Sequence, residues 1–499
     1  MARVTAGRKT TPSHKPIVLE RNISKISLTK IMVNNYMLPG VTVDTGLRRE
    51  YVYQDVAAHV LGYIGEISKS ELDGQAFPGA IAGDNIGKMG VERAFDTYLR
   101  GVSGGRQVEV NAVGRVQKTL KEILPTQGHN IYLTIDIELQ FLAESLLHDV
   151  AGAAVAVDPR DGRVLCMVSS PRFDLNLFNF GISRENWNEL QANPLRPLEN
   201  KAIRGEYPPG STYKGLVALA ALEEGIITPE TRFYCGGQLH FGNHEFRCWH
   251  RGGHGNVNLE QAMAHSCDVY FYQLGIKLGV DRIAKYANMF GLGSVTGIEI
   301  GNERPGLIPT RSWKKKRFGE NWFDGENLSV AIGQGYNLTT PMQLAMFTAA
   351  IANGGYLYTP TVIAKITDSD GNIIQDFTPQ LKYKINVNPE HIKLVQNGML
   401  QVVNGPGATG RRAALPGVVV AGKTGTSQVV SRKTKGDEPE PEKPVFQRPH
   451  GLFIAFAPYD NPVIAIAVIV ENGEGGGTAA LPVAREMLRF WLDKTGVSE

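Results

Sequence analysis

The sequence predicts an α+β protein in which an antiparallel sheet, with helices on both faces and an inserted helical subdomain, follows a smaller mixed α/β domain. Three observations support this prediction. The chain has 499 residues, too many for one ordinary domain. Its second part reads as a strand pair, a helical cluster, then three strands and a helix. Its first part has short mixed elements broken by glycines. The expected domains are therefore residues 1–145 and 146–499.

Local patterns predict the elements of the first domain. A helix is expected over 91–99, followed by a glycine-rich bend. Alternating polar and apolar residues predict strands at 107–110 and 130–135. The stretch from Asp136 to Leu147 then looks helical.

The second domain opens with a predicted hairpin. Ala153 to Val157 is an apolar run, Asp161-Gly162 is a turn signal, and Arg163 to Val168 returns as the partner strand. The later elements follow from the same reasoning. Helices are expected over 211–224, 259–278, 340–353 and 478–492, strands over 418–421, 451–457 and 463–471, and a long exposed loop rich in Lys, Glu and Pro over 431–448.

Composition and charge exclude some functions. Lys plus Arg is 52 and Asp plus Glu is 49, so the net charge of +3 argues against a nucleic-acid binder. No run of about 18 apolar residues is present, and the N-terminus lacks the apolar core of a signal peptide. Taken alone, these features are typical of a cytosolic protein.

A serine and a lysine three residues apart form the first catalytic motif. Ser211-Thr212-Tyr213-Lys214 follows Pro208-Pro209-Gly210, which cannot continue a helix, and begins an apolar helical run. The two side chains therefore share a helix face. A serine hydroxyl needs a neighbouring base to become a nucleophile, and a buried lysine with a lowered pKa can be that base.

Two further motifs follow in order. The first is Ser266-Cys267-Asp268, and the second is Lys423-Thr424-Gly425-Thr426, directly after an apolar strand. A strand edge carrying Lys and Thr suits a peptide that docks as an added strand and ends in a carboxylate. Each motif alone is weak, because a Ser-x-x-Lys tetrapeptide is usually a capping serine with a surface lysine. Their order and context together indicate a serine acyl-enzyme.

With these motifs, the chain resembles the class B penicillin-binding proteins of the elongation type, known as penicillin-binding protein 2, over nearly its whole length. Pro208 to Lys214 is close to the active-serine segment of the family, and Ser-x-Asp is typical of this subgroup. Further similar segments are Ile332 to Gly335, Thr340 to Ala345, and Gly90 to Glu92 with Leu99 to Gly101. The resemblance implies a β-lactamase-like transpeptidase domain over 146–499 and a pedestal, or dimerisation-like, domain over 1–145 that is truncated at its N-terminus.

The resemblance also implies a mechanism. Ser211 attacks the D-Ala–D-Ala bond of a peptidoglycan stem peptide, Lys214 is the general base, and Ser266 relays a proton with help from Lys423. The backbone N–H groups of Ser211 and Thr426 form the oxyanion hole. Asp268 holds Lys214 and the substrate amide. The substrate carboxylate lies on the last motif, Lys423 with Thr424, Gly425 and Thr426. An acceptor amine, or water in a carboxypeptidase, resolves the acyl-enzyme, and no cofactor is needed.

Partners and location come from the same resemblance. The expected partners are stem peptides, β-lactams, a SEDS-type glycan polymerase and scaffold proteins of the rod complex, with no nucleic acid. The expected location is the periplasmic face of the inner membrane, in a full-length protein whose anchor helix is absent from this chain.

Three of the four cysteines and one histidine suggest a metal site. Cys235, Cys248, His254 and Cys267 have spacings of 13, 6 and 13 and offer a ligand set suited to tetrahedral structural zinc. Some members of the resembled subgroup have zinc in this region. A disulfide, for example between Cys235 and Cys248, or unpaired buried thiols are the alternatives. Cys166 is expected in the core.

Two rival functions use the same motifs. A β-lactamase or β-lactam sensor is disfavoured because 157 positions separate Ser266 from Lys423, an interval much longer than in the compact enzymes resembled by these motifs. A non-enzymatic activator of a glycan polymerase is disfavoured because the catalytic motifs are complete.

Overall fold

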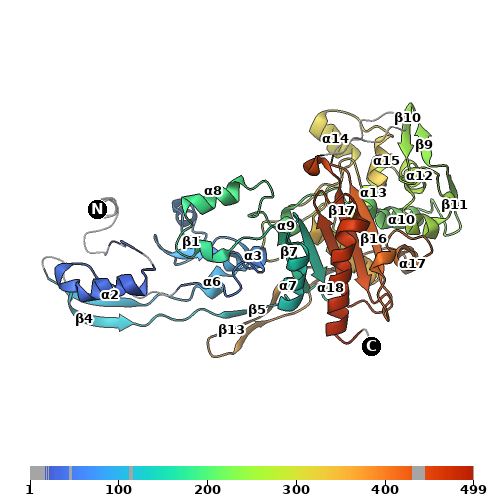
Figure 1. Ribbon diagram of the computed structural model, residues 1–499. Helices are drawn as coiled ribbons and strands as arrows, with labels where there is room; N and C mark the ends of the chain where they lie inside the picture. The colour runs from blue at the N-terminus through green and yellow to red at the C-terminus, as the bar shows by residue number, and fades with distance from the viewer. Residues whose placement is uncertain are drawn as a thin grey trace. The chain divides into compact units, whose positions relative to one another are not determined.

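A computed structural model describes residues 17, 19–20, 22–43, 48–111, 116–429 and 444–497 of the chain (Figure 1). The chain divides into two compact units. Unit 1 combines residues 1–131, 174–189 and 366–374, and unit 2 combines residues 132–173, 190–365 and 375–499. Across the described residues, no helix combines the length and the apolar character needed to cross a membrane.

Unit 1 is built from short elements. The four-residue helix α6 follows α5 directly, so the helix predicted over 91–99 is broken at Phe95, where the backbone leaves the helical region. Strands β3 and β4 pair antiparallel. A small core gathers Ile67, Phe77 and Ile86. The elements wholly within this unit are α2 (Lys25–Val33), η1 (Asn35–Met37), α3 (Ala58–Leu61), β1 (Ile64–Glu66), α4 (Lys69–Asp73), β2 (Asn85–Gly87), α5 (Gly90–Ala94), α6 (Asp96–Leu99), β3 (Gly105–Val110), β4 (Val116–Ile123) and η2 (Leu175–Phe178).

Unit 2 contains a five-stranded antiparallel sheet in the order β16-β17-β18-β6-β7. The predicted hairpin is confirmed, because β6 pairs antiparallel with β7 and Gly162 adopts φ +84° in the connecting turn. Strand β16 lies at one edge of the sheet, with Thr426 opposite Gly451 of β17. The bounds are β6 (Gly152–Val157), β7 (Val164–Ser170), β16 (Ala421–Ser427), β17 (His450–Ala457) and β18 (Ile464–Val470).

Helices cover both faces of this sheet. Ala154 and Ala156 of β6 join a core with α7 (Ile137–Leu146) and α18 (Leu481–Lys494), whereas Ala153 and Val155 point to the opposite face and are also fully buried. That second face is covered by α16 (Pro341–Ala352), which packs on β18, β6 and β17. A sheet buried on both faces explains why its strands read as continuous apolar runs.

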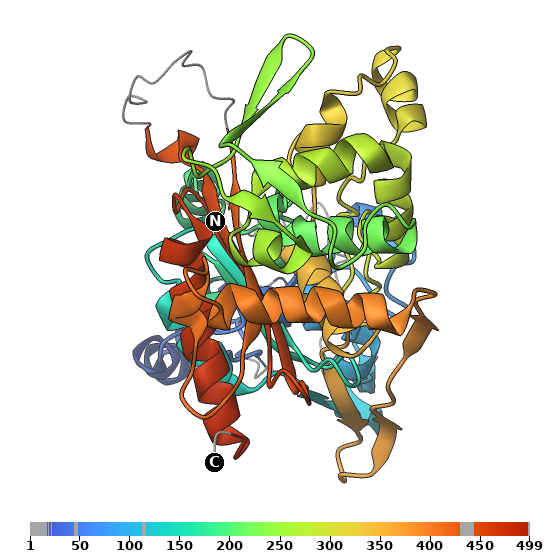
Figure 2. The same ribbon diagram turned by 90° about the vertical axis from the view of Figure 1, so that its right-hand side faces the viewer.

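A helical subdomain lies beside the sheet (Figure 2). Its elements are η3 (Gly210–Tyr213), α10 (Lys214–Glu223), β8 (Phe233–Cys235), β9 (Gln238–Phe241), β10 (His244–Arg247), β11 (Gly255–Val257), α11 (Leu259–Ala264), α12 (Asp268–Leu278), α13 (Val280–Met289), α14 (Arg311–Phe318), α15 (Glu326–Ala331) and α17 (Pro389–Asn404). The antiparallel hairpin of β9 and β10 projects from this subdomain in Figure 2.

The remaining elements are α8 (Arg184–Ala192), α9 (Lys201–Arg204), β5 (Asn130–Leu133), β12 (Tyr356–Tyr358), β13 (Ile363–Thr367), β14 (Ile373–Asp376), β15 (Leu381–Lys384), η4 (Arg411–Ala413), η5 (Val445–Gln447) and η6 (Gly476–Ala480). Of the loop predicted over 431–448, residues 431–443 lie outside the described residues.

Two further predicted elements were wrong in detail. The helix expected over 259–278 is two helices, α11 and α12, because Ser266 adopts a left-handed φ of +52° between them. The strand expected over 418–421 is instead β16, which begins at Ala421 and contains the Lys423-Thr424-Gly425 motif rather than preceding it.

Candidate active site

Ser211 lies in a tight turn at the start of a buried helix. The 3₁₀ turn η3 runs directly into α10, and the backbone N–H of Lys214 donates to the carbonyl of Ser211. Side chains three residues apart in a 3₁₀ turn lie on the same side. Ser211 is half-buried, whereas the Lys214 side chain is fully buried. The geometry of this turn therefore agrees with the prediction that the side chains of Ser211 and Lys214 lie on one face.

The hydroxyl of Ser266 brings the three motifs together. Lys214 Nζ donates to Ser266 Oγ at 3.2 Å, and Lys423 Nζ donates to the same oxygen at 2.9 Å. Ser266 and both lysines are buried. Two amines from distant parts of the chain thus meet at one hydroxyl, which is the arrangement that a proton relay requires.

Asp268 and a backbone carbonyl fix the position of Lys214. Nζ of Lys214 donates to Asp268 Oδ1 at 2.7 Å and to the carbonyl of Ser266 at 2.9 Å. The ring of Phe271 lies 5.4 Å from the same nitrogen. An ammonium group has three N–H donors. The Asp268 carboxylate, the Ser266 carbonyl and the Ser266 hydroxyl together accept all three.

Lys423 is the more strongly perturbed lysine. Its side chain is almost completely buried, and it also donates to the carbonyl of Thr424 at 3.0 Å. Burial, together with the charge of Lys214, holds the pKa of Lys423 well below its ordinary value. Lys423 can therefore give up a proton more readily than a lysine in water.

The edge of β16 faces the turn that carries Ser211. A Cβ atom placed on Gly210 would lie 2.5 Å from the carbonyl oxygen of Thr426 and 3.3 Å from its nitrogen. Both polar backbone atoms of Thr426 therefore point at the turn. Thr424 is half-buried, Gly425 is buried and Thr426 is exposed. The structure thus brings all of the predicted catalytic and substrate-binding residues into one region of unit 2.

Three residues at the site had no role in the sequence interpretation. The backbone N–H of Trp249 donates to Asp268 Oδ2 at 2.9 Å, and Thr424 Oγ1 donates to Thr409 Oγ1 at 3.1 Å. Gln334 donates from Nε2 to the carbonyl of Thr426 at 2.9 Å. Only Gln334 had a signal in the sequence, since it lies in the Gly333-Gln334-Gly335 segment.

Comparisons with known proteins identify the family. The family described as penicillin binding protein transpeptidase domain matches residues 152–489, and the penicillin-binding protein dimerisation domain matches residues 3–133. The chain belongs to the penicillin-binding protein transpeptidases. The predicted resemblance and fold class are therefore confirmed for this transpeptidase.

Several relatives of this transpeptidase have known names or structures. Peptidoglycan D,D-transpeptidase MrdA of Haemophilus influenzae is 37% identical over 98% of the chain and 76% of that protein, and the Escherichia coli K12 protein of the same name is 38% identical over 95% and 75%. PBP2 from Helicobacter pylori, solved in complex with MreC, has a TM-score of 0.81 at 32% identity and covers 95% of this chain and 84% of that one. Pseudomonas aeruginosa PBP2 has a TM-score of 0.75 at 37% identity and covers 90% and 92%.

A cysteine and histidine cluster lies next to the catalytic residues of this transpeptidase. The ligand atoms of Cys235, Cys248, His254 and Cys267 all lie within 4.8 Å of one another. His254 Nδ1 is 3.7 Å from the sulfur of Cys235 and 3.6 Å from that of Cys248. Tetrahedral zinc with ordinary bond lengths separates a sulfur and a nitrogen ligand by about 3.6 Å, so the residues fit a metal ion.

The alternatives for these cysteines can be compared with the structure. All four cysteines of the chain are free and buried, so the disulfide alternative is not adopted. Cys166 lies in the core on β7, as predicted. Cys267 is the residue between Ser266 and Asp268, so the cluster adjoins the second catalytic motif.

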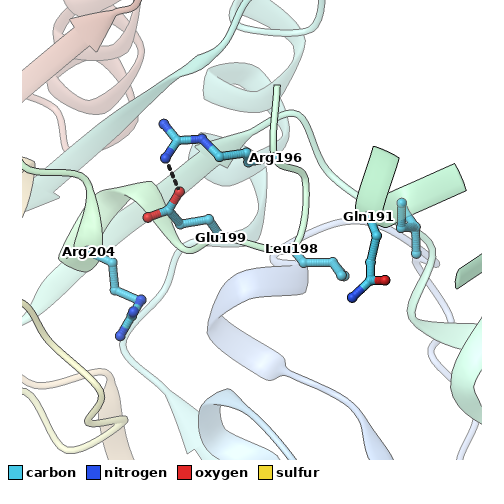
Figure 3. Close-up of a pocket in the computed structure, with 6 residues that line it drawn as sticks. Gln191, Arg196, Leu198, Glu199 and Arg204 are labelled. Carbon is cyan, nitrogen blue, oxygen red and sulfur yellow. Dashed lines mark ion pairs between the residues drawn. The ribbon is translucent and has the colours of Figure 1, made fainter. Parts of the chain in front are cut away.

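A separate pocket of about 370 Å³ in unit 2 of the transpeptidase contains none of these residues (Figure 3). Arg196 and Glu199 form an ion pair of 2.9 Å in it, and Arg204 donates to the carbonyl of Asn302. Its lining residues are Leu190, Gln191, Arg196, Leu198, Glu199 and Arg204. The arginines are therefore already held by partners within the fold.

Proposed function

We propose that this chain is a peptidoglycan D,D-transpeptidase that cross-links stem peptides during cell-wall elongation through an acyl-enzyme on Ser211 and that β-lactams inhibit. One observation carries this proposal. Lys214, which lies one turn after Ser211, and Lys423 both donate to the Ser266 hydroxyl. A serine without such a relay is a poor nucleophile.

During acylation a proton moves in two steps, first from Ser211 to Lys214 and then through Ser266 to the leaving amine. Ser211 Oγ forms a bond to the carbonyl carbon of the penultimate D-alanine, and its proton passes to Lys214, the general base. The C–N bond then breaks, and the terminal D-alanine leaves as an amine that takes a proton through Ser266. Lys423 assists this relay, because burial lowers its pKa and so makes its proton easier to give up than that of a lysine in water.

The edge of β16 orients the donor peptide. A peptide added beside this strand exchanges backbone hydrogen bonds with Thr426, which places its scissile carbonyl on the Thr426 N–H. With the N–H of Ser211, this group forms the oxyanion hole, and such donors contribute about 3 kcal/mol each in related hydrolases. Lys423, Thr424, Gly425 and Thr426 receive the terminal carboxylate.

The second half-reaction forms the cross-link. An amine from a neighbouring stem peptide attacks the ester carbonyl, the new amide forms, and the amine proton returns to Ser211 Oγ. If water enters instead, the product is a shortened peptide with a free carboxylate, which is the carboxypeptidase reaction.

A structural zinc ion held by Cys235, Cys248, His254 and Cys267 is part of this proposal. Bound zinc supplies structural stability and no step of the acyl transfer. The segment that carries Cys248 also places the Trp249 N–H on Asp268, so the cluster supports the carboxylate that holds Lys214.

We also propose domain boundaries, partners and a location for this chain. We assign residues 1–145 to the pedestal and 146–499 to the transpeptidase domain. The likeness to a PBP2 solved with MreC, and to a chain of a peptidoglycan synthase complex that coordinates polymerization and crosslinking, supports a glycan polymerase and rod-complex scaffold proteins as partners. Because its proposed substrate is peptidoglycan, we also propose that the protein acts at the periplasmic face of the inner membrane.

A synthetic stem peptide ending in D-Ala–D-Ala tests the proposal. With an acceptor amine present, we expect release of one D-alanine for each cross-linked or hydrolysed donor, blocked by penicillin. A Ser211→Ala variant that still released D-alanine would reject it. Rapid turnover of nitrocefin, rather than slow stoichiometric acylation, would favour a β-lactamase.

A further inference from the structure

The side chain of Gln334 donates a hydrogen bond to a carbonyl on the edge strand of the sheet. Its Nε2 donates to the carbonyl of Thr426 at 2.9 Å. Because β16 is the edge strand, this carbonyl has no neighbouring strand within the described sheet on that side. The side-chain amide therefore takes the place that the N–H of an added strand would occupy.

The backbone around Gln334 is firmly held. The N–H of Gln334 donates to the Ser329 carbonyl at 2.9 Å, and Asn337 Nδ2 donates to the Gln334 carbonyl at 3.2 Å. Gly333, with φ +71°, accepts at its carbonyl from the N–H of Gly210 at 2.9 Å. The side chain of Gln334, which is half-buried, is thus the part of this segment that can move while the turn beside Ser211 stays in place.

An arriving peptide needs the same carbonyl. In an antiparallel ladder, a hydrogen-bonded pair of residues exchanges both bonds, so a residue whose carbonyl accepts from the Thr426 N–H donates its own N–H to the Thr426 carbonyl. The residue whose carbonyl is attacked by Ser211 is therefore the residue that must displace the Gln334 amide.

We propose that Gln334 is a gating residue for the donor peptide. Its amide caps the Thr426 carbonyl in the empty enzyme and releases it only to a ligand that brings an amide N–H at the acylated residue. This inference rests on the proposed function. It makes Gln334 a determinant of how fast ligands with that N–H acylate Ser211, because such a ligand must break one hydrogen bond to form another, whereas a ligand without the N–H leaves the Gln334 bond intact.

Acylation by two β-lactams tests the inference in the full chain. One is a penam with an acylamino side chain, which has an amide N–H, and the other is the same penam with hydrogen in its place. For Gln334→Ala, we expect the second-order acylation rate of the acylamino compound relative to the unsubstituted compound to rise by about threefold or more, the effect of one hydrogen bond. The acylamino compound no longer has to break a hydrogen bond before it forms its own, whereas the unsubstituted compound leaves the Gln334 bond in place and gains nothing from its removal.

Gln334→Glu separates hydrogen-bond donation from bulk, since a carboxylate of the same length cannot donate. We expect the ratio to rise in this variant as well, whatever the absolute rates. An unchanged or lower ratio in both variants would overturn the inference. If neither compound acylated the unaltered protein, the proposed function itself would fail, which is a different result from acylation with an unchanged ratio.

Discussion

Lys214 and Asp268 form a partly buried ion pair, in which Nζ lies 2.7 Å from Oδ1 and the lysine side chain is fully buried. The second carboxylate oxygen accepts the backbone N–H of Trp249. Asp268 therefore joins the second catalytic motif to the first and to the segment after Cys248.

Asp268→Asn should lower the rate of acylation by penicillin about 100-fold, because Lys214 loses the charge that positions it. The free energy of unfolding should fall by about 3 kcal/mol, since one buried charge loses its partner. Stopped-flow acylation and denaturant unfolding measure the two effects.

Glu326→Gln is the matched control. Glu326 also accepts from one buried lysine, Lys314 at 2.6 Å, and from one backbone N–H, that of Phe323. The Glu326→Gln variant should lose about as much free energy of unfolding as Asp268→Asn but keep the acylation rate of the unaltered protein. Equal loss of acylation in both variants would reduce the role of Asp268 to stability alone.

Gly333→Ala should disturb the turn that carries Ser211. A Cβ atom there would lie 2.2 Å from the Gly210 carbonyl, so the turn must shift, and we expect acylation to fall about 100-fold. Gly335→Ala has a similar positive φ, +70° against +71°, but its Cβ would meet Ser329 Cβ at an ordinary 3.5 Å. Both variants carry backbone strain, so only the clash separates them. Similar acylation rates in the two variants would contradict this explanation.

Lys423→Met should abolish acylation and yet stabilise the protein at pH 7, by about 1–2 kcal/mol, because burial of the lysine charge is unfavourable. The pKa of Lys423 is lowered on folding, so between that lowered pKa and 10.5 the unfolded chain binds the proton and the folded chain does not. The stability of the unaltered protein should therefore rise relative to the variant as the pH increases from 7 to 10. Denaturant midpoints across this range provide the measurement, and a constant difference would be evidence against the shift.

Metal analysis should find about one zinc ion per chain. Removal by a chelator should lower the melting temperature by roughly 5–10 °C, because metal binding stabilises the folded state. Cys248→Ser should lose the metal, whereas Cys166→Ala, a change in the core of the sheet, should retain it. Full stability of a metal-free preparation would reject the zinc proposal.

The sequence allowed the sheet and the order of the motifs to be predicted, because their signals are local. Apolar runs marked β6, β17 and β18, and the Pro-Pro-Gly segment marked the turn before Ser211. The break at Ser266 had no local signal, since residues 259–278 contain no proline and a serine does not mark the left-handed backbone that it adopts there. The position of β16 was misjudged because its polar residues serve the site rather than the core.

The contacts that complete the site depend on the tertiary fold. Gln334 and Thr426 are 92 residues apart, and Lys423 and Ser266 are 157 apart. Spacing along the chain cannot show which of several polar groups meets a given carbonyl or hydroxyl. Trp249 was missed for a related reason, because its backbone N–H rather than its side chain contacts Asp268.

Labelling with a fluorescent penicillin, followed by digestion and mapping of the labelled peptide, tests the central claim most directly. One label per chain should appear on the peptide that contains Ser211, and Ser211→Ala should remove it while the protein stays folded. A label on any other residue, or undiminished labelling of the folded alanine variant, would contradict the assignment of Ser211 as the nucleophile.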